Sequence, residues 1–349
     1  MNSTPGKLTR SKRIVFALIA LTGSFGVVLV VLLGADLYAH HRVERSAGLN
    51  RNGYRGPVVG RKQPGEIRVA MLGGSTVFGF DSEVEDTLPA QLERAVAAVE
   101  PHLRVVNLGF NGEGAVTFVP TLHSYEYLDY DIVVLYEGYN DILGDSQPND
   151  FQKRHASVVF RTIGYFPILP LVLREKASFL RQGSGGSQAT FRPGLASRTS
   201  AAALEATSVI TEALERELGR VVKDVEAAPH SGQGCGPPWS YYCGAVGAAV
   251  RFAIDRGKSV LVVGQPRLAY GQAERHAWQQ RALAEMLAHD FNGDPRVRYV
   301  DAADAVDLSD NSVASDGLHL SRDANATVAA RLAGPVGEMV KARRSPPSR

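Results

Sequence analysis

The chain has 349 residues, of which 44% are hydrophobic and 21% charged, a balance typical of a folded protein with a sizeable core. Its formal net charge is only +2, which leaves no broad basic field to attract a polyanion. We therefore expect no nucleic-acid partner. The length allows one large domain or two small ones.

The N-terminal region contains an uncharged apolar run, Ile14–Gly34, whose 21 residues are enough to cross a bilayer. Four basic residues and no acidic residue precede it: Lys7, Arg10, Lys12 and Arg13. The positive-inside rule then predicts that residues 1–13 are cytoplasmic and that the rest of the chain lies in the periplasm or at the cell surface. The alternatives are a cleaved signal peptide, whose apolar region is usually about 7–15 residues long, and a buried core helix.

Beyond this expected transmembrane helix at 14–34, the sequence changes character. Residues 35–66 become polar and rich in Gly, Pro and Arg, which predicts a linker. A folded domain is expected from 67 to 342, and a disordered tail at 343–349.

Within the expected domain, five short apolar runs predict buried strands: Ile67–Leu72, Leu103–Leu108, Asp131–Tyr136, Ser259–Gly264 and Val297–Asp301. Helical patterns separate or follow most of them, at Leu88–Val99, Ala201–Glu226, Ala273–His289 and Asp323–Val340. Strands that alternate with helices predict an α/β fold, in which helices cover both faces of a parallel sheet. Reactive groups in such folds gather where the strands end.

The long connection between the third and fourth strands is expected to hold an insertion, residues 143–200. Part of it, Val158–Leu180, is apolar and aromatic but is interrupted by Pro167 and Pro170. This pattern favours a lid or a membrane-surface segment over a second membrane span. The helix predicted at Ala201–Glu226 would then cross over to the fourth strand.

The two cysteines, Cys235 and Cys243, stand close together in the part of the chain expected outside the cytoplasm. A disulfide between them is plausible in that compartment. Two free thiols are the alternative.

Polar and small residues follow four of the five predicted strands. Ser75 lies in GGST, Gly112 in NLGFNG, Asn140 in YEGYND, and Asp316 and His319 in SDGLHLS. Taken singly, each has an ordinary structural explanation, because Gly, Ser, Asn and Asp all favour turns and caps. Their joint order is more specific.

This order of motifs resembles the SGNH hydrolases, also called GDSL-type esterases and lipases, over about Ile67 to Leu332. The resemblance implies a three-layer αβα fold with a five-stranded, flavodoxin-like parallel sheet. It also implies that Ser75 is the nucleophile, that Asp316 and His319 complete a triad, and that Gly112 and Asn140 match the two remaining family positions; Gly109 is a weaker match for the glycine. One departure is Gly74, which stands where many members have the Asp of Gly-Asp-Ser.

The chemistry of these residues supports the same interpretation. A serine hydroxyl needs a base within hydrogen-bond reach, and His is suited because its ordinary pKa lies near 6.5. Asp316, three residues before His319, can accept from one ring nitrogen and leave the other for Ser75. The backbone N–H groups of Ser75 and Gly112 and the amide of Asn140 would then stabilise the oxyanion.

Motifs for other chemistries are incomplete. Gly257-Lys258-Ser259 precedes a strand, whereas a phosphate-binding loop would follow one. The Asp-rich stretch at 301–310 lacks the ligand spacing of a calcium loop, and no His/Cys cluster has metal spacing. We expect neither a cofactor nor a metal.

The sequence thus predicts a serine esterase, anchored in the cell membrane, that removes O-acyl groups from a glycan or lipid outside the cytoplasm through an acyl-Ser75 intermediate. Family resemblance and location favour O-acetyl groups. The alternatives are an O-acyltransferase that acts on an exported polysaccharide and a non-catalytic membrane assembly factor. Protein partners are not predicted.

Overall fold

The computed structural model describes residues 9–142, 160, 163–169, 172 and 228–344. Its centre is a sheet of five parallel strands in the order β2-β1-β3-β4-β5. The strands are β1 (Ile67–Gly73), β2 (Leu103–Asn107), β3 (Ile132–Tyr136), β4 (Ser259–Gly264) and β5 (Val297–Asp301). All five predicted strands are confirmed, and the order is the flavodoxin-like one, in which the connection reverses direction between β1 and β3.

The apolar runs form strands because helices cover both faces of the sheet. Every residue of β3 and β4 is buried, whereas the edge strand β5 is only partly buried. Strands covered on both faces lose the alternation of polar and apolar residues. This is why the central strands could be recognised in the sequence as continuous apolar runs.

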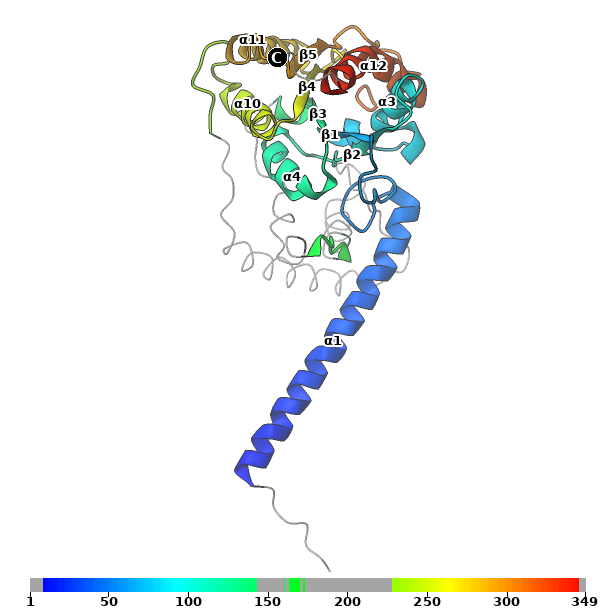
Figure 1. Cartoon of the computed structure of the whole chain (residues 1–349), viewed down its shortest axis with the longest axis vertical. Coiled ribbons are helices and arrows are strands. Elements are labelled where there is room, and N and C mark those ends of the chain that lie inside the picture. The colour runs from blue at the N-terminus through cyan, green and yellow to red at the C-terminus, as the bar shows by residue number, and fades with distance from the viewer. Residues whose placement is uncertain (1–8, 143–159, 161–162, 170–171, 173–227, 345–349) are drawn as a thin grey trace, which may run out of the picture.

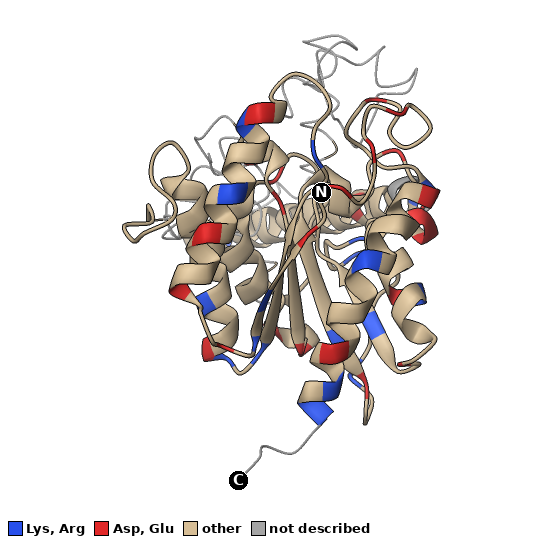
Figure 2. Cartoon of the chain, turned by 90° about the horizontal axis from the view of Figure 1, so that it is seen from above, with Lys and Arg blue, Asp and Glu red and all other residues tan. Residues whose placement is uncertain are grey.

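Helices form the two outer layers (Figure 1). One face of the sheet packs against α3 (Leu88–Ala97) and α12 (Arg322–Arg344), the other against α4 (Phe118–Ser124), α10 (Ser240–Asp255) and α11 (Ala273–Asp290). A separate apolar cluster fills the space on each side. Figure 2 shows acidic and basic residues interspersed along the helices, in keeping with the near-neutral net charge.

Helix α10 was not predicted from the sequence. Its first turn lies in a segment rich in Gly, Pro and Tyr, and the disulfide between Cys235 and Cys243 joins this turn to the preceding loop. Helix α10 directly precedes β4 and packs on it, so it occupies the place of a crossover helix. The helix predicted at Ala201–Glu226 and most of the insertion at 143–200 lie outside the described residues.

Helix α1 (Arg10–Ala47) is longer than the predicted span and continues through the first part of the expected linker. Its apolar residues are exposed: Val30, for example, is 71% and Leu29 49% exposed. The last turns differ, because Asp36, His40 and Val43 are buried against the rest of the protein. Figure 1 shows the helix projecting from the globular part.

Two polar residues on α1 contact the described part of the insertion. Asp36 accepts hydrogen bonds from the Tyr165 hydroxyl and from the backbone N–H of Leu169, the latter at 2.6 Å. His40 Nε2 lies 2.6 Å from the carbonyl oxygen of Phe166. Because Asp36 comes only two residues after the apolar run ends, the globular part begins directly at the end of the predicted span.

The part of the expected linker around Leu49–Arg55 is also packed into the domain, which differs from the predicted linker. Leu49, Asn50, Tyr54 and Arg55 are buried. The polar groups of this segment form hydrogen bonds inside the domain: Asn50 Nδ2 donates to the carbonyl of Gly56 at 2.9 Å, and the backbone N–H of Arg55 donates to the carbonyl of Asn107 at 3.2 Å. The folded domain therefore begins before Leu49.

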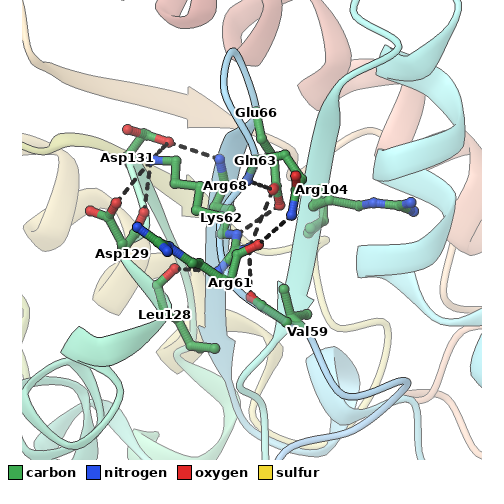
Figure 3. A network of polar contacts seen from close by, with 12 residues as sticks. Val59, Arg61, Lys62, Gln63, Glu66, Arg68, Arg104, Leu128, Asp129 and Asp131 are labelled. Carbon is green, nitrogen blue, oxygen red and sulfur yellow. Dashed lines mark hydrogen bonds and ion pairs between the residues drawn. The ribbon is translucent and has the colours of Figure 1, made fainter.

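A polar network holds the last residues of this segment beneath the sheet, at the end where the strands begin (Figure 3). Lys62 Nζ lies 2.7 Å from Asp131 Oδ2, just before β3. Arg68, in β1, donates to the carbonyls of Gly60 and Leu128, both at 2.8 Å. The network therefore lies at one end of the sheet, and the predicted site lies at the opposite end, where the strands terminate.

Candidate active site

Ser75 lies at the point where β1 ends and the short helix α2 (Ser75–Phe78) begins. The preceding turn is tight, since a Cβ on Gly73 would stand 2.2 Å from the carbonyl oxygen of Tyr136 in β3. Gly79 closes the helix in the left-handed region at φ 82°, and its N–H donates to the carbonyl of Ser75. Glycine is suited to both positions, one for space and one for backbone conformation.

His319 reaches Ser75 from a segment 244 residues later in the chain. Its Nε2 lies 2.8 Å from Ser75 Oγ, and its Nδ1 lies 2.5 Å from Asp316 Oδ2. Gly317, at φ 74°, allows the chain to turn between the acid and the imidazole. The structure thus brings the three predicted residues into one continuous chain of hydrogen bonds.

Asp316 is further held by its own turn, because its Oδ1 accepts from the backbone N–H groups of Leu318 and His319. Partial burial acts to raise the pKa of Asp316, but hydrogen bonds from the side chain and backbone of His319 outweigh it and keep this pKa below its ordinary value. A carboxylate that stays ionised favours a proton on Nδ1 and leaves Nε2 to accept from the serine hydroxyl.

The site is enclosed around the serine and open toward the acid. Ser75 is 2% exposed and the His319 side chain 8%, whereas the side chain of Asp316 is 48% exposed. The ring of Phe80 lies 4.9 Å from the imidazole of His319, centroid to centroid. The reactive hydroxyl is therefore shielded, and the exposed end of the triad faces solvent.

Asn140 and the loop of Gly112 lie beside the serine turn. Asn140 Nδ2 donates to the carbonyl of Glu113 at 2.8 Å, and a Cβ on Gly74 would stand 2.2 Å from the same nitrogen. On the other side of Gly112, the N–H of Phe110 donates to the carbonyl of Gly73 at 3.0 Å. Gly112 itself has φ 72°.

Gly109 is placed differently from Gly112. A Cβ on Gly109 would stand 2.6 Å from the backbone nitrogen of Phe78, so this glycine is needed for close packing against α2. A Cβ on Gly112 would meet nothing within 4 Å. The surroundings of Gly112 therefore leave room for a ligand group, which supports it as the second family position.

Sequence reasoning missed Glu137, which is 3% exposed at the end of β3. Burial, with the neighbouring Asp141 carboxyl, raises the pKa of Glu137 to about 8, although hydrogen bonds from backbone N–H groups oppose this. A carboxyl group directly after a buried apolar strand is the sequence signal that could have identified it.

His276 and Gln265 were also missed and lie next to the Asn140 loop. The N–H of Tyr139 donates to Gln265 Oε1 at 2.9 Å, and the ring of Tyr139 lies 4.8 Å from that of His276. Burial lowers the pKa of His276 to about 4, so this imidazole is neutral at physiological pH. His276 and Gln265 support the Asn140 loop and do not contact Ser75, His319 or Asp316.

Among the described residues, no group of three or more His, Cys, Asp or Glu side chains is placed to hold a metal ion. The chemistry available at the site is that of a serine hydroxyl with an imidazole base and nearby amide donors. Such a group attacks acyl carbons and passes through an acyl-serine intermediate.

The parallel sheet, the serine turn at the end of β1 and the Asp-x-x-His loop after β5 occur together with Asn140 at the end of β3. This arrangement is the one expected from the resemblance to the SGNH hydrolases. The residues that match the SGNH positions follow strand ends on the same edge of the sheet.

A scan of protein-family models and a search of curated proteins found no match. Solved structures to which this chain is similar include that of a putative lipolytic protein of the G-D-S-L family from Desulfitobacterium hafniense, with 12% identity, a TM-score of 0.41 and coverage of 78% of this chain and 99% of the other. A family 3 carbohydrate esterase from Clostridium thermocellum shows 11% identity, a TM-score of 0.41 and coverage of 80% and 100%. An acetylxylan esterase from Geobacillus stearothermophilus shows 12% identity, a TM-score of 0.41 and coverage of 78% and 94%.

Proposed function

We propose that the protein is a serine esterase, anchored in the membrane by α1 and acting outside the cytoplasm, that removes O-acyl groups from a glycan or lipid. O-acetyl groups are the leading substrate class. The observation that carries the proposal is the unbroken hydrogen-bond chain from Asp316 through His319 to Ser75.

In the acylation step, Ser75 Oγ attacks the acyl carbon while His319 Nε2 takes the hydroxyl proton. Asp316 stabilises the imidazolium that forms and remains ionised. The tetrahedral intermediate collapses, the ester oxygen leaves, and His319 returns its proton to the leaving alcohol. Water, activated in the same way, then releases the acyl group from Ser75.

The oxyanion of each tetrahedral intermediate would receive hydrogen bonds from the backbone N–H groups of Ser75 and Gly112 and from the side-chain amide of Asn140. One donor of this kind typically contributes about 3–4 kcal/mol of barrier lowering. The amide of Asn140 is held in place by its hydrogen bond to the carbonyl of Glu113 and lies against Gly74, the residue before Ser75, so this donor is positioned before substrate arrives.

The choice of acetyl as the leading acyl group rests on the family resemblance and on the proposed location outside the cytoplasm.

Helix α1 supports the proposed location. None of its most apolar window is buried against the protein, and a continuous apolar surface of this kind is favourable in lipid rather than in water. The contacts of Asp36 and His40 bring the globular part directly to the end of the span. A substrate at or near the membrane surface fits this arrangement.

The test uses the detergent-solubilised full-length protein, a fluorophosphonate probe and aryl esters of increasing acyl length. We expect the probe to label Ser75, acetyl esters to be hydrolysed fastest, and Ser75→Ala to lose labelling and nearly all turnover without loss of folding. Ser315→Ala, which changes an exposed serine next to Asp316, should remain active. Absence of labelling in the folded wild type would favour a non-catalytic role, and transfer of the acyl group to added glycan in preference to water would favour an acyltransferase.

A further inference from the structure

Glu137 occupies a position between the serine turn and the Asn140 loop. Its Oε2 accepts from the backbone N–H of Gly74 at 2.5 Å. Its Oε1 accepts from the N–H groups of Gly138 at 2.8 Å and Asn140 at 3.0 Å. One buried carboxyl group therefore binds the N–H of Gly74, the residue before Ser75, and the N–H of Asn140 at the same time.

This contact explains the glycine at position 74. A Cβ on Gly74 would stand 2.6 Å from Glu137 Oε2 as well as 2.2 Å from Asn140 Nδ2. Both distances are far below van der Waals contact. The carboxyl group supplied by β3 thus fills the space in which a side chain on the serine turn, such as an Asp, would otherwise lie.

The neighbouring carboxyl group, Asp141, extends the contacts to the Gly112 loop. Its Oδ2 accepts from the N–H of Ala115 at 2.9 Å, and a Cβ on Gly114 would stand 2.6 Å from its Oδ1. The two acidic side chains together contact all three loops from which the oxyanion donors come. Both are almost fully buried, Glu137 at 3% and Asp141 at 1% exposed.

We propose that Glu137 is a positioning residue that sets the distance between the Ser75 and Asn140 donors of the oxyanion site. This inference rests on the proposed function. Donors stabilise a developing oxyanion only when they are held in place before the reaction, and a misplacement of about 1 Å can lower the rate about 100-fold. Glu137 does not touch the substrate and acts through the peptides that it holds.

The chemistry of the pocket supports a specific role for the carboxyl group. Both of its oxygens accept from N–H groups, so an amide in its place would direct its NH₂ at a donor. The titratable groups near Glu137 are the Asp141 carboxyl and the hydroxyls of Tyr136, Tyr139 and Tyr242. The Tyr242 hydroxyl donates to the backbone carbonyl of Glu137 at 2.7 Å. The raised pKa of Glu137 reflects its burial and the nearby Asp141.

The experiment compares wild type with Glu137→Gln and Glu137→Asp in the full-length protein. Aspartate keeps the carboxyl group but is one methylene shorter, so it cannot reach Gly74 and Asn140 together. Glu100→Gln is the matched control, because Glu100 is 6% exposed and ion-paired with Arg344, in the loop before β2 at the opposite end of the sheet. Fluorophosphonate titration counts the competent sites, so that kcat is expressed per labelled serine.

We expect kcat per labelled site to fall about 10- to 100-fold in both Glu137 variants, with KM within about twofold of wild type. Inhibition by a boronic acid, which forms a tetrahedral adduct on the serine, should weaken by a similar factor. Glu100→Gln should lower the melting temperature and leave kcat per site unchanged.

Either of two results would overturn the inference: kcat per site within about threefold of wild type, or loss of folding in both Glu137 variants, which would make the residue purely structural. A wild-type protein that the probe does not label would instead refute the proposed function, so the two failures are distinguishable.

Discussion

Arg55 offers a direct test of whether the segment before β1 belongs to the catalytic domain. Its guanidinium is buried, with Nη1 donating to the carbonyls of Phe78 at 2.7 Å and Gly79 at 2.5 Å and Nη2 donating to that of Ser82. The carbonyls of Phe78 and Gly79 stand at the end of the helix that Ser75 begins, and Ser82 follows three residues later. Arg55→Met keeps most of the apolar stem but removes every donor.

The magnitude follows from these contacts. A hydrogen bond from a charged donor contributes about 1.5–3 kcal/mol, and the variant removes three. Burial lowers the pKa of Arg55 to about 10, although the nearby Glu83 and Glu85 oppose this, and the residue therefore stays charged at neutral pH. The cost of desolvating this charge offsets part of the stabilisation from its hydrogen bonds. We expect a net loss of about 3 kcal/mol, which corresponds to a fall in melting temperature of roughly 6–12 °C.

Thermal unfolding of the full-length protein in detergent measures the stability, and ester hydrolysis per labelled serine measures the activity. Since the contacts of Arg55 hold the end of the Ser75 helix, activity per site should fall roughly tenfold. Arg61→Met, a change at an exposed arginine in the same segment, should alter neither. If Arg55→Met matched Arg61→Met in both assays, the segment would be a passive tether and our account of it would be wrong.

Two further predictions concern residues that only the structure placed. Phe166→Ser and Ile168→Ser, at side chains 1% and 0% exposed, should each destabilise the protein by about 3–5 kcal/mol, and activity on small and membrane-presented esters should be lost together. Ile163→Ser, at a side chain 70% exposed, should be tolerated. Selective loss of activity on the membrane-presented substrate would instead support the lid interpretation. Because the pKa of His276 is about 4 when folded and near its ordinary 6.5 when unfolded, the unfolded state binds the proton first, and stability should fall as the pH drops from about 6.5 to 4, by up to about 3 kcal/mol. His276→Phe should flatten this part of the stability profile, and an unchanged profile would contradict the assignment.

Much of the fold could be predicted because its signals are local. Central strands such as β3 and β4 are continuous apolar runs in the sequence. Helix α3 begins after Thr87, which caps it, and has Pro89 in its first turn. Helix α10 was missed because its first turn contains the residues of a disulfide-bonded loop. Packing against the sheet overrides that weak local preference.

The candidate site was predicted from the order of its motifs, and the structure places Ser75, His319 and Asp316 within hydrogen-bond distance. Their catalytic roles stay a prediction until the serine is tested. The position of Glu137 directly after an apolar strand was only a weak signal, because that position does not distinguish a carboxyl group that organises a site from one that faces solvent.

The sequence by itself determined which segments become strands, where an apolar span lies and in what order the reactive residues follow, because each depends on neighbours along the chain. The tertiary structure alone decided which polar groups meet: Glu137 with the N–H of Gly74, 63 residues away, and His40 with the carbonyl of Phe166, 126 residues away. A buried polar group must find a partner wherever the fold brings one. Such partners come from distant segments, so a linear pattern cannot identify them.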